Sequence, residues 1–202
     1  MAGCRSRGGV RLLPDLGELA CAADNTLWLF GLEDGEMRHV MNGHLENVIR
    51  LAISPDGRLL ATGSDTPTAW GRSEILLWTL DPPNLVRRLA GDSASITSLA
   101  FSKDAGLLAS GGAKLRLWRA SDGWQLSILD DRPMSLAFSS DSRILAAGEW
   151  DGTIRLWDVS QGRLAGILDG HPAPVVALMF TEDGTGLVSA SLDGTVRLWG
   201  VR

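Results

Sequence analysis

A short segment that carries an aromatic residue near its end recurs along the chain with a period of about 40 residues. The two clearest copies read DGTIRLWD at residues 151–158 and DGTVRLWG at residues 193–200, and weaker copies read AKLRLW at 113–118, EILLWT at 74–79 and DNTLWLFG at 24–31. A fixed period constrains the fold more than any other feature, because it requires one structural unit to be repeated. The aligned aromatic residues are Phe30, Trp78, Trp118, Trp157 and Trp199, and the widest gap between neighbours is the first one, from Phe30 to Trp78.

Two further motifs recur along the chain. A Gly-His pair follows the aromatic residue at Gly43-His44 and Gly170-His171, and Gly91-Asp92 takes the equivalent place after Trp78. An apolar motif precedes the aromatic segment, and its copies read VRLLPD (10–15), LAISPDG (51–57), LAFS (99–102), LAFS (136–139) and LMFTEDG (178–184).

The spacing inside each unit predicts four antiparallel strands. Side chains alternate between polar and apolar across Thr153–Trp157, which is the period of two of a β-strand. The Asp-Gly pairs at 151–152 and 193–194 supply the positive φ angles of tight hairpin turns. The third strand should end at the aromatic residue, and the fourth should precede Gly-His, as in Leu164–Leu168. We expect first strands near 48–53, 96–101, 134–138 and 175–180, and second strands near 58–64, 106–111, 143–148 and 186–191.

Short, evenly spaced strands would also suit a β-sandwich, but a period near 40 with Gly-His and Trp is far more typical of a β-propeller blade. We therefore predict an all-β propeller of five four-stranded blades in which the last strand is missing. Residues 1–9 are expected to be a disordered extension. The approximate blades are 10–43, 44–91, 92–130, 131–169 and 170–202.

Over residues 10–202 the chain resembles the WD-repeat family. The resemblance implies a β-propeller that serves as a platform for protein assembly and that carries no catalytic residues or cofactor. It also implies a buried network of His, Ser or Thr, Asp and Trp in each blade, with a structural role. In blade five the full set is present, and blades two, three and four keep part of it. The expected members are His171, Ser191, Asp193 and Trp199 in blade five, His44, Ser64 and Trp78 in blade two, Trp118 in blade three, and Asp151 and Trp157 in blade four, where Glu149 replaces Ser.

Ser, His and Asp together could suggest a hydrolase. The repeated spacing favours a structural role instead, because each blade would otherwise hold a partial triad. The sequence contains no Walker loop, dinucleotide fingerprint or HExxH motif. We therefore expect a chain that is not an enzyme.

Composition argues against some classes of partner. The net charge is −5, and Arg5, Arg7 and Arg11 form the one basic cluster, so no nucleic acid is expected. No apolar run in the sequence is long enough for a membrane span. The two cysteines cannot form a disulfide framework, and Cys21 lies in an apolar run that is typical of a core. Met1–Cys4 resembles the end of a lipoprotein signal, but no apolar region precedes it, and we expect a cytoplasmic protein.

An insertion in blade two is the first candidate for a binding surface. The segment from Leu51 to Trp78 is longer than the equivalent segments of blades four and five, which end at Trp157 and Trp199. The extra residues lie within 66–73 and include Trp70 and Arg72, two residue types that are enriched at binding hot spots. The alternative is that Trp70 packs back onto its own blade.

Trp150, just before the turn of blade four, is the second candidate, since the repeat pattern gives it no role. A structural role for Trp150 is the alternative. The third candidate is the set of loops before each first strand, where Glu46, Asn47 and Arg132 lie on the same predicted face as Trp150. We expect a protein or peptide to bind this face.

The number of blades is unusual, because propellers of this family mostly have seven, at about 40 residues each. Five blades of four strands need twenty strands, and the sequence predicts nineteen. Three explanations are open. The chain is the C-terminal part of a larger protein, which we favour; it closes with another chain; or it closes as five blades. An open arc would expose apolar faces on blades one and five. The leading function is an interaction scaffold, and the alternative is a regulatory or sensor module of a larger signalling protein.

Overall fold

The computed structural model describes residues 9–66, 73–89 and 94–200, which form five antiparallel sheets in chain order. Blade one contains β1 (Val10–Leu13), β2 (Glu18–Ala23), β3 (Thr26–Gly31) and β4 (Met37–Asn42). Blade two contains β5 (Val48–Ile53), β6 (Leu59–Ser64), β7 (Ile75–Leu80) and β8 (Pro83–Leu89). Blade three contains β9 (Ser98–Phe101), β10 (Leu107–Gly111), β11 (Leu115–Arg119) and β12 (Gln125–Leu129). Blade four contains β13 (Ser135–Phe138), β14 (Ile144–Gly148), β15 (Ile154–Asp158) and β16 (Arg163–Leu168), and blade five contains β17 (Val175–Phe180), β18 (Gly186–Ser191) and β19 (Val196–Gly200).

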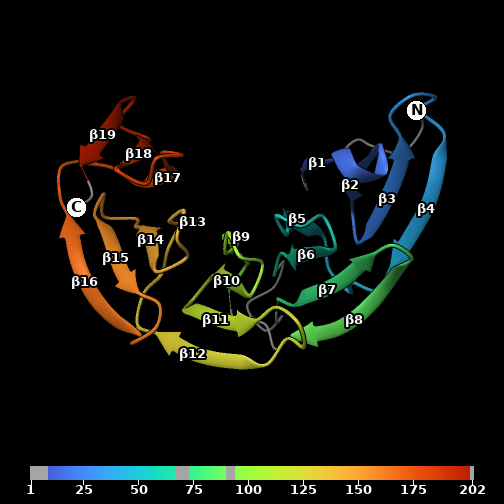
Figure 1. Ribbon diagram of the computed structural model, residues 1–202, viewed down its shortest axis with the longest axis horizontal. Helices are drawn as coiled ribbons and strands as arrows, with labels where there is room; N and C mark the ends of the chain where they lie inside the picture. Colours follow the sequence, from blue (N-terminus) through green and yellow to red (C-terminus); the bar gives the residue numbers. More distant parts are fainter. Residues whose placement is uncertain (1–8, 67–72, 90–93, 201–202) are drawn as a thin grey trace.

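These nineteen strands confirm the predicted all-β architecture with three strands in the last blade. In each blade the strands pair in sequence order. The first strand of one blade contacts the first strand of the next, and the blades follow one another along an arc (Figure 1). The third strands run one or two residues past the aromatic position. In blades one to four the pairing with the fourth strand shifts register just before that aromatic residue, as a β-bulge does.

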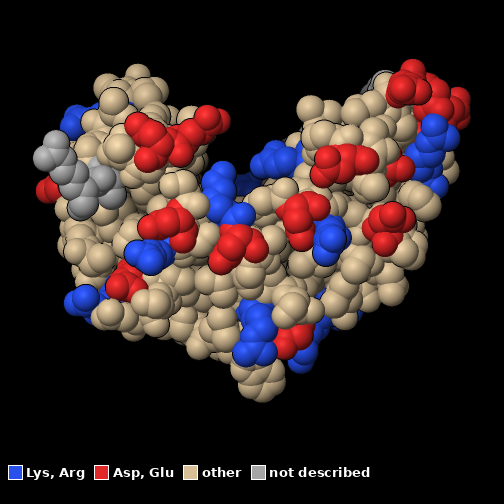
Figure 2. Space-filling view, in the orientation of Figure 1, with Lys and Arg blue, Asp and Glu red and all other residues tan. Residues whose placement is uncertain are grey.

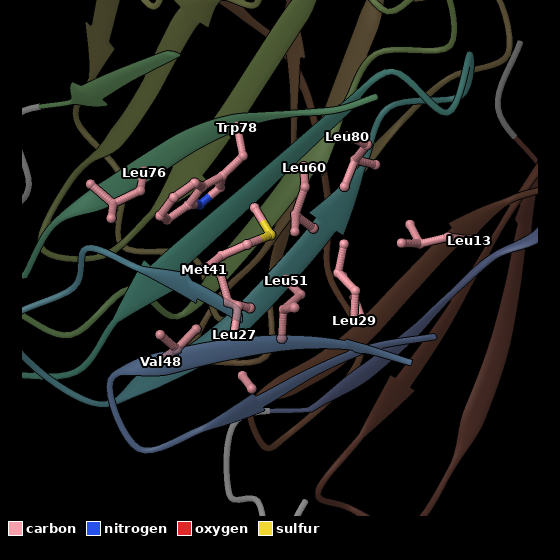
Figure 3. Close-up of a cluster of buried hydrophobic side chains, with 12 residues drawn as sticks. Leu13, Leu27, Leu29, Met41, Val48, Leu51, Leu60, Leu76, Trp78 and Leu80 are labelled. Atoms are coloured by element: carbon pink, nitrogen blue, oxygen red, sulfur yellow. The ribbon is translucent and has the colours of Figure 1, made fainter. Parts of the chain in front are cut away.

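The hydrophobic core lies between neighbouring blades rather than inside any one of them. Four clusters of buried side chains fill the four blade-to-blade interfaces. Between blades one and two, Leu27, Leu29 and Met41 face Leu60 and Trp78 (Figure 3). Each fully buried Leu contributes about 1.5 to 3 kcal/mol relative to an exposed one, so adjacent blades stabilise each other.

The arc does not close. Blades one and five lie at its opposite ends (Figure 1), and Figure 2 shows an open notch between them. Large apolar side chains are accordingly exposed on blade five, where Met179, Val196 and Leu198 are 64%, 69% and 72% exposed. Within the described residues, β19 pairs with β18 alone. The described part of the chain also has no helix with the length and apolarity to cross a membrane.

The turn between β14 and β15 packs closely against the loop that enters blade five. Gly152 in this turn has a φ of 90°, a conformation that favours glycine. A Cβ atom built on Gly152 would lie 1.9 Å from the carbonyl oxygen of His171. This contact requires glycine and fixes the position of the neighbouring Trp150 and Asp151.

Candidate functional site

The polar network of blade five links a loop to two strands. His171, in the loop between β16 and β17, places Nδ1 2.7 Å from Asp193 Oδ2 and Nε2 2.7 Å from Ser189 Oγ. Because Asp193 can only accept, Nδ1 carries the proton and the Ser189 hydroxyl donates to Nε2. Trp199 Nε1 donates to the same Ser189 Oγ at 2.8 Å. His171 and Ser189 are 3% and 0% exposed, so the network is a buried and fully paired support.

The serine of this network is Ser189, whereas the sequence pattern placed Ser191 there. Ser191 instead donates to the Ala173 carbonyl at 2.9 Å and accepts from the Asp193 backbone N–H at 3.1 Å. Residues two apart on a strand point to the same face, so the pattern could not separate the two serines. Ser191 therefore holds the turn and the preceding loop rather than the histidine.

The turn carboxylate of blade five accepts several hydrogen bonds. Asp193 Oδ1 accepts from the backbone N–H of Thr195 at 2.7 Å and from its hydroxyl at 2.6 Å. The Thr195 hydroxyl, and after it the His171 side chain, lower the pKa of Asp193 to about 2. The carboxylate is thus ionised at neutral pH and orients His171.

Blade two has a similar arrangement with other residues, except that His44 Nδ1 has no hydrogen-bond partner. His44 Nε2 lies 2.6 Å from Thr62 Oγ1, which also accepts from Trp78 Nε1 at 2.9 Å. Thr62 therefore takes the position that the sequence pattern gave to Ser64, and Ser64 accepts from the backbone N–H of Glu74 at 2.9 Å. Glu74 replaces the turn aspartate, with Oε1 3.3 Å from His44 Nδ1.

Burial controls the charge of His44. The loss of solvent lowers the pKa of His44 to about 4, while Glu74 opposes this shift and Arg88 adds to it. The folded pKa is below the ordinary value of 6.5, so the stabilising contribution of neutral His44 is complete above that pH. It is lost as the pH falls from 6.5 towards 4.

Blade three keeps only one such bond among the described residues: Trp118 Nε1 donates to Ser110 Oγ at 2.8 Å. Blade four departs furthest from the pattern. There the loop between β12 and β13 contributes Asp131, whose side chain is fully buried. Asp131 Oδ2 accepts from Trp157 Nε1 at 3.0 Å, and Oδ1 accepts from Arg155 at 2.6 Å. An ion pair thus replaces the histidine network.

Glu149, directly after β14, lies beside this ion pair and is only 6% exposed. Burial, followed by a hydrogen bond and the charge of Asp131, raises the pKa of Glu149 to about 8. Glu149 is therefore mostly protonated at neutral pH. Glu149 Oε1 is buried and has no hydrogen-bond partner.

These groups line an open hollow of about 560 Å³ at one end of blade four, which we call the acidic hollow. Trp150 stands at its edge and is 58% exposed. The lining residues are Asp130, Asp131, Arg132, Glu149, Trp150, Asp151 and Arg155.

The structure brings together two of the residues that the sequence nominated for partner binding, Trp150 and Arg132. Glu46 and Asn47 lie in the loop before β5 and do not line the acidic hollow; Asn47 is exposed and Glu46 is half-buried. Trp70 and Arg72 lie outside the described residues. Within the described ranges, no three His, Cys, Asp or Glu side chains are grouped so that they could hold a metal ion.

Sequence reasoning missed Asp131 and Arg155. A usable signal was present, because Asp131 lies four residues before the first residue of β13. His44 and His171 lie four residues before β5 and β17. Counting back from the start of the strand, rather than from the Gly-His pair, would have identified Asp131 as the replacement for histidine.

Five sheets that pack side by side, each with a buried or partly buried aromatic residue on its third strand, define a β-propeller type of scaffold. The family model described as WD domain, G-beta repeat, matches residues 35–66, 83–119, 126–158 and 162–200. The chain belongs to this WD40 repeat family.

Similar proteins carry the same repeats. The chain is 30% identical over 126 residues to the periodic tryptophan protein 2 homolog of Schizosaccharomyces pombe. This match covers 59% of this chain and 14% of that protein. It is 33% identical over 138 residues to WD repeat-containing protein SL1-17 of Schistosoma mansoni, with coverage of 66% and 44%. It is 31% identical over 150 residues to small ribosomal subunit protein RACK1y of Oryza sativa subsp. japonica, with coverage of 68% and 42%. The chain thus spans less than half the length of each of these relatives. Proteins of this family generally act as interaction scaffolds that bind other proteins.

Proposed function

We propose that this chain is a non-catalytic scaffold that binds a protein or peptide at the loop face of blade four, with Trp150 as the main anchor. The exposure of Trp150 carries this proposal. Trp150 is 58% exposed on a turn that Gly152 fixes against blade five. A rigidly held, exposed Trp beside a hollow offers a large contact area at little cost in conformational entropy.

The buried state of the Ser, His and Asp network supports a role without catalysis. A hydrolase nucleophile must reach its substrate. Ser189 is 0% exposed, and its hydroxyl oxygen already accepts from Trp199. The network is therefore built to hold the loop that carries His171.

A second reading is a regulatory or sensor module within a larger signalling protein. The short coverage of the relatives supports it, since each is more than twice the length that the match spans. In that case the same loop face would bind a domain of the same protein. An in-frame coding sequence for a catalytic domain, joined to this one, would favour this reading.

The test of the scaffold is selection of peptides from a random phage-displayed library on the immobilised chain, followed by Trp150→Ala. We expect the affinity for the selected peptides to fall at least tenfold, because a central Trp contributes about 2 kcal/mol or more to an interface. The melting temperature should change by less than about 2 °C, since the side chain is exposed.

Trp124→Ala is the matched control, because Trp124 is 60% exposed in blade three and does not line the acidic hollow. Peptides that bind equally well to the Trp150→Ala variant, or that lose as much affinity with Trp124→Ala, would show that the anchor is elsewhere.

A further inference from the structure

One acceptor in the acidic hollow has no donor. Glu149 Oε1 is buried without a hydrogen-bond partner, although Glu149 lines an open hollow. A buried polar atom without a partner costs about 1 to 3 kcal/mol. A donor that enters the hollow would remove this cost.

The other carboxyl groups of the hollow already have partners. Asp131 accepts from Arg155 and Trp157, and Asp130 forms an ion pair with Lys114. Asp151 accepts from the backbone N–H of Thr153 at 3.0 Å. Glu149 is therefore the group in the hollow that is open to a new cation.

We propose that the acidic hollow receives a lysine or arginine side chain of the partner, whose N–H donates to Glu149 Oε1. This inference rests on the proposed function and specifies the chemistry of the partner. The hollow holds four carboxyl groups and two guanidinium groups, so its formal charge favours a cation. Trp150 at the edge offers its ring to the aliphatic stem or to the charge of that side chain.

Binding of the basic side chain should be coupled to release of a proton. The groups that face Glu149 are Asp130, Asp131 and Arg132 from the loop before β13, Asp151 from its own turn, and Arg155 from β15. Burial, and after it Asp131, keep Glu149 protonated at neutral pH. An incoming cation favours the ionised form, so the affinity should rise with pH until Glu149 is ionised in the free protein.

The experiment uses two pairs of acetylated, amidated peptides, Gly-Gly-X-Gly-Gly. In one pair X is lysine or its uncharged analogue norleucine, and in the other X is arginine or citrulline. Binding to the whole chain is followed by NMR through the indole N–H signal of Trp157, which donates to Asp131. We expect the charged peptides to bind at least tenfold more tightly than their neutral analogues at pH 9, and about fivefold more weakly at pH 6.5 than at pH 9. The arginine peptide stays fully charged over this range, so a pH effect on its binding reports on the protein.

Glu149→Gln removes the charge and keeps a donor for Asp131, and it should abolish both the preference for a cation and the pH effect. Asp183→Asn, on an exposed turn of blade five, is the matched control for net charge and should change neither. Equal binding of charged and neutral peptides, or unchanged binding to Glu149→Gln, would overturn the inference.

These outcomes are separate from those of the scaffold test. Library peptides that depend on Trp150 but lack lysine and arginine would leave the proposed function standing and refute the basic side chain. The opposite result is also distinguishable. If the library peptides bind without Trp150, and the cation preference still depends on Glu149, the proposed anchor is refuted and the hollow is supported as a site for a basic side chain.

Discussion

Blades four and five use equivalent positions for different polar groups. Both turns place an aspartate, Asp151 or Asp193, two residues before a threonine whose backbone N–H and hydroxyl it accepts. Below the turn, blade five buries His171, which is paired on both ring nitrogens, whereas blade four buries Asp131. The same backbone structure thus supports two polar networks. In blade five both nitrogens of His171 have partners, whereas in blade four Glu149 Oε1 has none.

The difference follows from the strand residues that face the loop. In blade five Ser189 gives the histidine a hydroxyl partner, and the equivalent position of blade four, ten residues before Trp157, is Ala147. Asp131 therefore takes the indole N–H of Trp157 directly and needs Arg155 to balance its charge. Glu149 occupies the place of Ser191 and brings a second carboxyl group beside the first. Loss of the histidine network converts a structural site into a polar hollow.

The largest expected effect comes from breaking the ion pair of blade four. Asp131→Ala should destabilise the protein by about 3 kcal/mol, because it leaves Arg155 and the Trp157 indole without their acceptor. His171→Ala should cost less, about 2 kcal/mol, because the Asp193 carboxylate that loses the imidazole still accepts two hydrogen bonds from Thr195. Urea denaturation of the two variants measures the comparison. A smaller loss for Asp131→Ala than for His171→Ala would show that blade four does not depend on its ion pair.

Stability against pH gives the next effect. The folded pKa of Glu149, about 8, is above its ordinary value, so the folded state holds the proton more tightly than the unfolded state. The contribution of Glu149 to wild-type stability should therefore fall as the pH rises from about 4.5 to about 8. Glu149→Gln lacks this loss and should exceed the wild type by about 1 to 3 kcal/mol at pH 9, with little difference near pH 5. One pKa unit corresponds to about 1.4 kcal/mol, and water reaches a carboxyl group beside an open hollow, which reduces the gain.

The effect of His44 cancels in this comparison, because both proteins contain it. Denaturant melts at pH 5, 7 and 9 provide the measurement. A difference between the variant and the wild type that does not change with pH would mean that Glu149 titrates as an ordinary carboxyl group.

Much of the fold could be predicted because each copy of the repeat marks where its strands begin and end. The strands β5 and β17 begin and end where the pattern places them, since turn residues and alternation fix both ends. The site was less accessible to such reasoning. Ser189 and Ser191 share a strand face, and only the three-dimensional path of the loop decides which of them meets His171. Asp131 escaped notice because blade four lacks the Gly-His pair, and only the distance of four residues to the start of β13 marks Asp131 as the replacement.

The smallest expected effect separates the two turns themselves. Asp193→Asn should lower the melting temperature by about 2 to 4 °C, because an amide is a poorer acceptor for the His171 ring N–H and for Thr195. Asp151→Asn should lower it by less than about 1 °C, because Asp151 accepts from Thr153 alone among the described hydrogen bonds. Thermal melts monitored by tryptophan fluorescence at pH 7 compare the two. Equal losses would mean that each aspartate stabilises its blade through the hydrogen bonds of the turn and not through His171. Blades four and five would then differ in the residues beneath the turn and not in the turn itself.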